Sequence, residues 1–173
     1  MMFPNPVRRS FLFAARPGAK RDIPPGLRDY AACALAGLIA EARQQAIADG
    51  VRPIPGTASR ALLGYFPEAL LRKCRFAVGE AQPLKLSSVR LSYGDPSAIT
   101  LGDVVVFRSD RAAQTDLQAW AHALTHVMQY QRWGLEDFAQ RYVRDSAALE
   151  QEAAGNAARF MAWSRDKDAM ACC

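Results

Sequence analysis

Hydrophobic residues follow a helical spacing in the first part of the chain. Between residues 27 and 48 they recur every three or four positions, which predicts a packing helix that ends at Gly50. The residues of this stripe are Leu27, Ala31, Leu35, Leu38, Ala42 and Ala46. A short rigid connection is expected at residues 53–56, which contain two prolines. Two brief helices are expected to follow, at residues 58–63 and 67–74.

The spacing of apolar residues changes to two beyond Arg75. Residues 89–93 alternate between apolar and polar side chains, and a Gly-Asp-Pro turn follows at residues 94–96. Extended chain is expected again at residues 99–101 and 104–107. This pattern predicts a small antiparallel sheet of about three strands.

Helical spacing returns in the second half of the chain. Asp110 or Asp116 is suited to cap a helix that ends at Gly134, and a last helix follows. Helices at both ends of the chain with a sheet between them predict an α+β fold. A chain of 173 residues, 50% of them hydrophobic, buries a sizeable core without disulfides or metal. We therefore expect residues 26–173 to form a single domain.

The net charge of +5 is unevenly distributed along the chain. Five basic residues precede the first acidic residue, Asp22: Arg8, Arg9, Arg16, Lys20 and Arg21. The rest of the chain is balanced, which argues against a nucleic-acid-binding surface. Residues 1–25 are expected to form a basic, poorly ordered arm, with contact to an acidic partner or a membrane surface as the alternative.

The sequence favours a cytoplasmic protein. The pair Arg8-Arg9 imitates a twin-arginine export signal, but the chain continues through further basic residues rather than through an apolar stretch. No run reaches the length of about 18 apolar residues that crosses a bilayer, so no transmembrane segment is expected. The four cysteines lack metal or disulfide spacing, which favours a reducing compartment.

The two histidines of the chain, His122 and His126, are four residues apart. On a helix this spacing places both imidazoles on one face, where they can bind a single metal ion. It is the spacing of zinc sites of the HExxH type, in which the intervening glutamate is the general base. Ala123 occupies the position of that glutamate. The alternative is a pair of half-buried histidines that bind backbone carbonyls.

A third ligand is expected from the last helix, which carries Glu150 and Glu152. These residues lie about 200° apart around a helix axis, so both cannot face one ion. Glu152 is preferred because it shares its side of the helix with large apolar residues such as Phe160. Glu150 is the alternative ligand, and solvated glutamates are the alternative to any metal role. Asn156, one turn beyond Glu152, is expected to hold the second nitrogen of a histidine.

Two further residues lie near these candidate ligands in the sequence. Tyr142 falls between His126 and Glu152, and it is a candidate to stabilise an oxyanion, with core packing as the alternative. Gln129 is one position off the face of His126, and we expect it to be solvated.

The runs AWAHALTHVMQYQRWG, FAQRY and LEQEA resemble small bacterial gluzincin-like domains that have long been catalogued as a family of unknown function. Its members typically read AHELTHVxQ followed by a distal ExEA, and some accompany toxin and contractile-injection modules. The similarity covers residues 98 to about 160. It implies a minimal zincin-like fold, a Zn²⁺ ion on His122, His126 and Glu152, and hydrolysis of a peptide or protein substrate. Export by a signal-independent secretion or injection system is the implied alternative to a cytoplasmic location.

The resemblance also implies a substrate-side strand beside the histidines. This strand contains Ile99, Thr100, Leu101 and Gly102. An unpaired strand edge recruits extended peptide backbone. The alternative is an ordinary interior strand.

Ala123 departs from the family pattern at the residue that accepts the proton. Without that base the chain is expected to be inactive or nearly so. The alanine is either an engineered substitution, which the intact ligand positions favour, or a natural feature of a pseudoenzyme. The alternative functions are a non-catalytic, zinc-containing adaptor that binds peptide, and a generic α+β interaction domain without metal.

Overall fold

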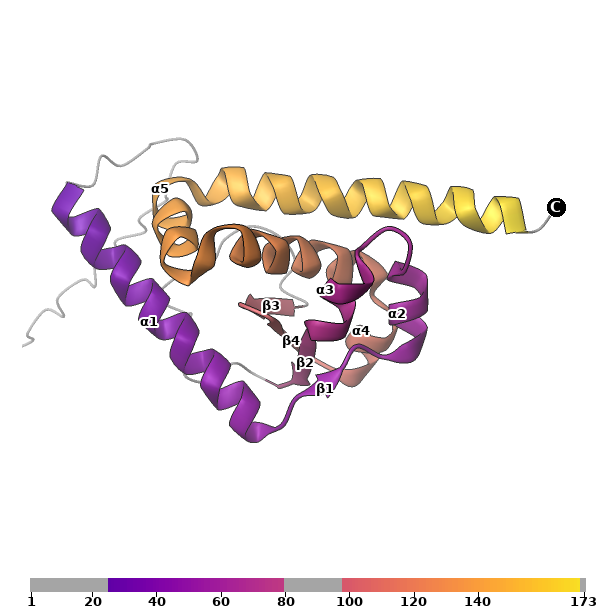
Figure 1. Ribbon diagram of the computed structural model, residues 1–173, viewed down its shortest axis with the longest axis horizontal. Coiled ribbons are helices and arrows are strands. Elements are labelled where there is room, and N and C mark those ends of the chain that lie inside the picture. The colour runs from indigo at the N-terminus through magenta and orange to yellow at the C-terminus, as the bar shows by residue number, and fades with distance from the viewer. Residues whose placement is uncertain (1–24, 80–97, 172–173) are drawn as a thin grey trace, which may run out of the picture.

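The computed structural model describes residues 25–79 and 98–171, which form a small sheet surrounded by helices (Figure 1). The elements in chain order are α1 (Pro25–Asp49), β1 (Arg52–Pro53), α2 (Gly56–Leu62), α3 (Glu68–Lys73), β2 (Arg75–Val78), β3 (Ala98–Leu101), β4 (Val104–Phe107), α4 (Asp110–Thr115) and α5 (Leu117–Ala171). The predicted α+β class and the helical C-terminal part are confirmed. The predicted basic arm and the boundary at residue 26 lie at the edge of, or outside, the described residues and stay predictions.

The helix α5 spans 55 residues and is interrupted at two positions where the backbone is not helical. Gly134 has φ 76° and ψ 173°, a conformation that favours glycine, and Asp145 has φ −156° and ψ 74°. The Asp145 side chain accepts a hydrogen bond from the Ala148 amide at 3.2 Å, so it caps the segment that follows. The last segment of α5 therefore runs back beside the first (Figure 1). The predicted end of a helix at Gly134 is confirmed.

The predicted sheet of about three antiparallel strands was wrong in the number of strands and in the direction of one pairing. The described sheet has four strands in the order β1-β2-β4-β3, and β2 pairs with β4 in parallel. The missed strand β2 has two consecutive buried residues, Phe76 and Ala77, so it lacks the alternation from which strands were predicted. The pair β3–β4 is antiparallel as expected. The strand predicted at residues 89–93 lies outside the described residues.

The helices α1 and α5 enclose the sheet with two groups of buried side chains. One group is centred on Trp120, Phe107 and Phe160, which are fully buried. The other joins α1 to strands β2, β3 and β4 and to α5. The predicted packing role of α1 holds for Leu35 and Ala42, which are buried, but Leu27 and Leu38 of the predicted stripe are 56% and 36% exposed. Ile39, which the stripe did not include, is buried instead. These contacts fix the first segment of α5, which carries both histidines, against the sheet.

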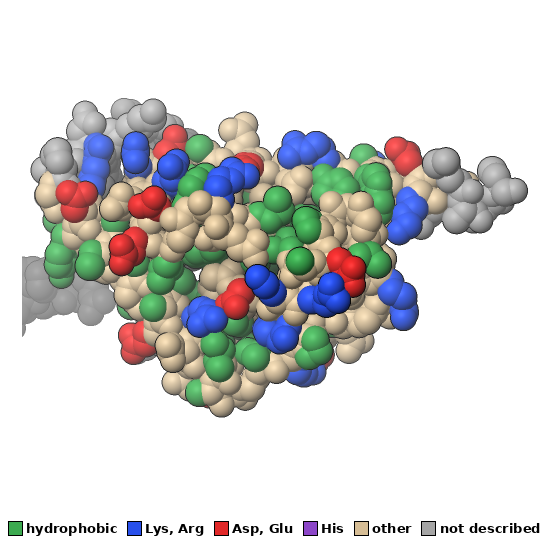
Figure 2. Space-filling model, in the orientation of Figure 1, with side chains coloured by type: hydrophobic (Ala, Val, Ile, Leu, Met, Phe, Trp, Pro, Cys, Tyr) green, Lys and Arg blue, Asp and Glu red, His purple; other side chains and the backbone are tan. Residues whose placement is uncertain are grey.

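On the face shown in Figure 2, basic and acidic side chains are interspersed with hydrophobic ones. In the described part of the chain, no helix combines the length and the apolar character that a bilayer crossing requires.

Candidate metal centre

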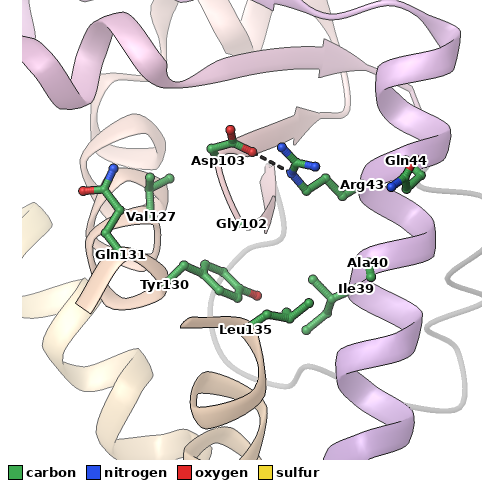
Figure 3. A pocket seen from close by; sticks show the side chains of 10 residues that line it. All are labelled: Ile39, Ala40, Arg43, Gln44, Gly102, Asp103, Val127, Tyr130, Gln131 and Leu135. Atoms are coloured by element: carbon green, nitrogen blue, oxygen red, sulfur yellow. Dashed lines mark hydrogen bonds and ion pairs between the residues drawn. The ribbon is translucent and has the colours of Figure 1, made fainter. Parts of the chain in front are cut away.

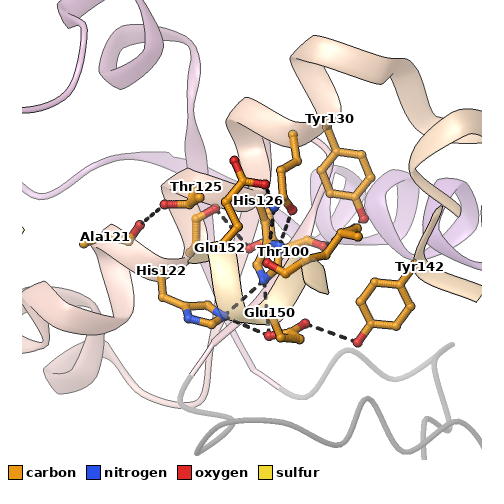
Figure 4. Close-up of polar contacts among 12 residues, drawn as sticks. Thr100, Ala121, His122, Thr125, His126, Tyr130, Tyr142, Glu150 and Glu152 are labelled. Carbon is orange, nitrogen blue, oxygen red and sulfur yellow. Dashed lines mark hydrogen bonds and ion pairs between the residues drawn. The ribbon is translucent and has the colours of Figure 1, made fainter. Parts of the chain in front are cut away.

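The two histidines lie together on the first segment of α5, as the spacing predicts (Figure 4). Their Nε2 atoms are 3.1 Å apart, and their ring centroids are 4.8 Å apart. His126 is buried, whereas His122 is partly exposed. The pair thus presents two ring nitrogens to one point at the edge of the core.

The carboxylate that meets these nitrogens belongs to Glu150. Its Oε2 atom lies 3.2 Å from Nε2 of His122 and 3.5 Å from Nε2 of His126. The three ligand atoms all lie within 4.8 Å of one another. One carboxylate and two imidazoles therefore converge from two segments of α5 that the breaks at Gly134 and Asp145 bring side by side.

The preference for Glu152 as the third ligand is not what the structure shows. Glu152 Oε2 instead accepts a hydrogen bond from Gln129, and Arg132 lies 3.4 Å from its other oxygen. The sequence argument assumed that the bulkier side of the last helix faces the histidines. The buried face of that helix contains Leu149 and Phe160 and, between them, Ala153 and Ala157, whose small side chains permit a close approach to its neighbour. Glu150 shares the side of these alanines and is carried to the histidines.

The electrostatics of the cluster keep Glu150 ionised. Partial burial raises the pKa of Glu150, but its hydrogen bonds with His122 and His126 outweigh burial and lower that pKa to about 2. Tyr142 donates its hydroxyl to the other carboxylate oxygen at 3.2 Å. Burial, followed by the nearby Glu150 charge, raises the pKa of Tyr142, so this hydroxyl stays protonated as a donor. Tyr142 reaches the site, and in this structure it orients Glu150.

Gln129 is a residue whose importance sequence reasoning missed. Its side chain is 0% exposed, which corrects the expectation that it is solvated. Its Oε1 atom lies 2.8 Å from Nδ1 of His126, and its Nε2 atom lies 3.2 Å from the Leu149 carbonyl. The available signal was its position three residues after His126, which places it beside the histidine on a helix.

Asn156 does not hold a histidine. It donates to Thr125 Oγ1 at 2.8 Å and accepts from the Tyr65 hydroxyl at 2.9 Å. The role predicted for Asn156, contact with the second nitrogen of a histidine, is filled by Gln129, which contacts Nδ1 of His126. Asn156 links the last segment of α5 to the first and to the chain after α2, so its role in this structure is to hold the two segments together.

Ala123 lies against the sheet with a side-chain position that is 2% exposed. Its carbonyl accepts a hydrogen bond from Thr100 Oγ1 at 3.4 Å, so β3 runs beside the helix at the level of the histidines. Within the described sheet β3 is the end strand, and Leu101 faces the core. The methyl group of Ala123 offers no proton acceptor at this position. The use of Ile99, Thr100, Leu101 and Gly102 as a substrate edge stays a prediction.

The donor set fits Zn²⁺. Zinc is bound in proteins by imidazole nitrogen and carboxylate oxygen, and three protein ligands that leave a position open are typical of catalytic zinc. The carboxylate is ionised, and Gln129 holds the outer nitrogen of His126, as an outer partner does in such sites. His122, His126 and Glu150 are therefore the residues that would hold the ion.

A second concave region lies between α1, the turn after β3 and α5 (Figure 3). It has a volume of about 330 Å³ and is lined by apolar side chains such as Ile39 and Leu135. Its charged groups are already paired, because Arg43 Nε donates to Asp103 Oδ1 at 2.6 Å. We call this region the α1 cavity.

The fold and the cluster define an α+β domain with a candidate metal centre on its longest helix. A family described as the eCIS core domain, associated with contractile injection systems, matches residues 75–134. The matched stretch runs from β2 to the first break in α5, so it includes both histidines but not Glu150. The expected association with injection systems agrees with this match, whose description names neither a metal nor a reaction. No curated protein and no solved structure matches the chain.

Proposed function

We propose that the protein is a zinc-binding, gluzincin-like domain associated with a contractile injection system. The observation that carries the proposal is the convergence of His122, His126 and Glu150, whose ligand atoms lie within 4.8 Å of one another. The match of residues 75–134 to the eCIS core domain supports the setting. Export by an injection system belongs to the same proposal.

The chemistry proposed for this site, when a glutamate stands at position 123, is hydrolysis of a peptide bond. Zinc supplies a Lewis acid that polarises a carbonyl and lowers the pKa of a coordinated water. Glu150 contributes an ionised carboxylate, and Tyr142 holds that carboxylate in place. Ala123 accepts no proton, and the loss of a positioned general base typically slows a reaction about 10²- to 10⁴-fold. The chain as it stands is therefore inactive or nearly so.

Zinc binding is tested by elemental analysis and by competition with a chromophoric chelator. We expect one zinc per chain for the unsubstituted protein and less than about a hundredth of its affinity for His122→Ala, because loss of a ligand exceeds the 10- to 100-fold effect of an outer partner. Gln131→Ala is the matched control, since Gln131 is exposed on the same helix and lines the α1 cavity. The proposal is contradicted if all three proteins contain close to zero zinc ions per chain.

Catalytic competence is tested by restoring the base. Ala123→Glu is expected to cleave members of a peptide library in a reaction that a chelator stops. Ala123→Gln is the control, because it adds nearly the same volume at the buried position without a proton acceptor. Cleavage by both variants, or by neither while zinc remains bound, contradicts a latent peptidase.

A second candidate function is a zinc-containing adaptor that binds peptide without cutting it. Two observations favour it, namely the alanine at position 123 and the place of β3 at the end of the described sheet. An extended peptide adds to such an edge through backbone hydrogen bonds. Peptide binding by the unsubstituted protein, together with an Ala123→Glu variant that holds zinc and cleaves nothing, supports the adaptor over the peptidase.

A further inference from the structure

Gln129 connects the metal centre to a carboxylate that does not touch it. Its Oε1 atom faces Nδ1 of His126 at 2.8 Å, and its Nε2 atom faces Glu152 Oε2 at 2.9 Å. The other oxygen of Glu152 lies 3.4 Å from Nη1 of Arg132. A chain of contacts therefore runs from the protein surface, through a fully buried amide, to one of the two histidines.

The partners of Gln129 allow one orientation of its amide. The carbonyl of Leu149 and the carboxylate of Glu152 accept hydrogen bonds and cannot donate them, so the atom that faces both must be the NH₂ group. The oxygen must then face His126. An amide oxygen only accepts, so Nδ1 of His126 must carry the proton.

The tautomer of His126 follows from this orientation. A neutral imidazole with its proton on Nδ1 has its lone pair on Nε2. Nε2 is the atom that lies 3.1 Å from His122 Nε2 and 3.5 Å from the Glu150 carboxylate. The amide thus turns the metal-binding nitrogen of His126 towards the other two ligands.

We infer that Gln129 is a positioning residue that selects the metal-binding tautomer of His126, and that Glu152 holds Gln129 in place rather than binding the ion. The inference rests on the proposed zinc site and specifies how that site is prepared. A carboxylate commonly orients a zinc-bound histidine directly. Here an amide lies between the carboxylate and the ring, so the negative charge of Glu152 stays at the partly exposed edge of the protein.

The first experiment measures the tautomer without metal. Long-range ¹H–¹⁵N correlation spectra at about pH 8.5, two units above the usual histidine pKa of about 6.5, distinguish the proton on Nδ1 from the proton on Nε2. The chain has two histidines, and His122→Ala assigns their signals. We expect His126 in the Nδ1–H form in the unsubstituted protein and a shift towards the Nε2–H form in Gln129→Met. Gln131→Met, an exposed change two residues away, is expected to leave the spectrum unchanged.

The second experiment measures zinc and cobalt affinity in the same proteins. We expect Gln129→Met to weaken zinc binding about 10- to 100-fold with unchanged stoichiometry, and to alter the visible spectrum of the Co²⁺ form. Glu152→Gln keeps an acceptor for Gln129, so its affinity is expected to stay within about twofold. Glu152→Leu removes that acceptor at a partly exposed position, with a loss of up to about tenfold.

The outcomes separate this inference from the proposed function. If no protein in the series binds zinc, the proposed function fails, while the tautomer measurement still decides the role of Gln129. If Gln129→Met is unfolded, the same tautomer and affinity measurements are made on Glu152→Leu, because Glu152 is partly exposed and its loss removes an acceptor of Gln129. An Nε2–H form of His126 in the unsubstituted protein, or an unchanged tautomer and affinity in the folded Gln129→Met or Glu152→Leu protein, overturns the inference. Loss of zinc by Glu152→Gln with retention by Glu150→Gln makes Glu152 the ligand and overturns it as well.

Discussion

The candidate metal centre and the α1 cavity both lie beside α5, but their charged and polar groups are arranged in opposite ways. In the α1 cavity, the guanidinium of Arg43 meets the carboxylate of Asp103 at 2.6 Å, so the two charges satisfy each other. In the metal centre, two ring nitrogens and a carboxylate oxygen meet one another, and the outer atoms of His126 and Glu150 are held by Gln129 and Tyr142.

This difference distinguishes a cavity that merely has room for a ligand from a cluster that has the polar atoms to bind one. The cavity has the volume for a small ligand, yet no described charged group in it is left to recognise one, whereas the metal centre offers three ligand atoms that suit a cation. The direction in which polar atoms point is therefore the better guide to chemistry in this protein.

The largest effect is expected from Phe138, which links the two regions. Its ring stacks on Tyr130 with centroids 3.8 Å apart and meets the His126 ring edge-on at 6.2 Å. Phe138→Ala is expected to lower the free energy of unfolding by about 3–5 kcal/mol, because it leaves a cavity between buried rings. Urea unfolding measures this, with Phe138→Leu as the smaller change. A cost under about 1 kcal/mol for Phe138→Ala would mean that the two regions are not joined through this ring.

The next effect compares zinc affinity after one substitution in the candidate metal centre and one in the α1 cavity. His126→Ala is expected to weaken zinc binding by more than about 100-fold, which corresponds to about 2.7 kcal/mol, because it removes a ligand. Asp103→Asn, in the α1 cavity, is expected to leave zinc affinity within about twofold. Isothermal titration with zinc measures both. Equal losses in the two variants would show that the ion does not prefer the histidine cluster.

A smaller effect is expected from Tyr130, which lines the α1 cavity and donates its hydroxyl to the Thr100 carbonyl at 3.4 Å. Tyr130→Phe removes this long hydrogen bond and keeps the ring, so the free energy of unfolding should fall by about 0.5–1.5 kcal/mol. Zinc affinity should not change. A change in zinc affinity without a change in stability would place Tyr130 in the metal centre instead.

The smallest effect concerns the ion pair of the α1 cavity and depends on pH. Partial burial raises the pKa of Asp103, but the hydrogen bond and charge of Arg43 outweigh burial and hold that pKa below its usual value of 3.8. A carboxyl group with a depressed folded-state pKa stabilises the protein above its unfolded pKa and loses this contribution as pH falls through the folded value. The side chains are 36% and 42% exposed, so Asp103→Asn should cost less than about 1 kcal/mol at pH 7. Unfolding curves of the two proteins should converge as pH falls below about 3.8, and a constant difference would argue against the ion pair.

The parts of the structure that were predictable from sequence are those set by neighbouring residues. The helix α1, the common face of His122 and His126, and the stop at Gly134 all follow from spacing within a few residues. The choice between Glu150 and Glu152 was not predictable in this way. It depends on which side of one helix approaches another, and this is set by the break at Asp145 and by the small size of Ala153.

The missed contacts share a physical cause. The parallel pairing of β2 with β4 joins segments that are distant in the chain, and nothing in the composition of β2 names its partner. The burial of Gln129 likewise depends on a carbonyl and a carboxylate from the segment of α5 that follows the break at Asp145. A glutamine on a helix surface and a glutamine enclosed by two helices look the same in the sequence.

The reversal of α5 at Gly134 and Asp145 makes the three ligand atoms a clasp between the two arms of a helical hairpin. His122 and His126 sit on one arm, and Glu150 sits on the other. A partner that displaces the C-terminal arm from its neighbour would therefore separate Glu150 from the histidines, so displacement of this helix and release of the proposed ion would be a single event.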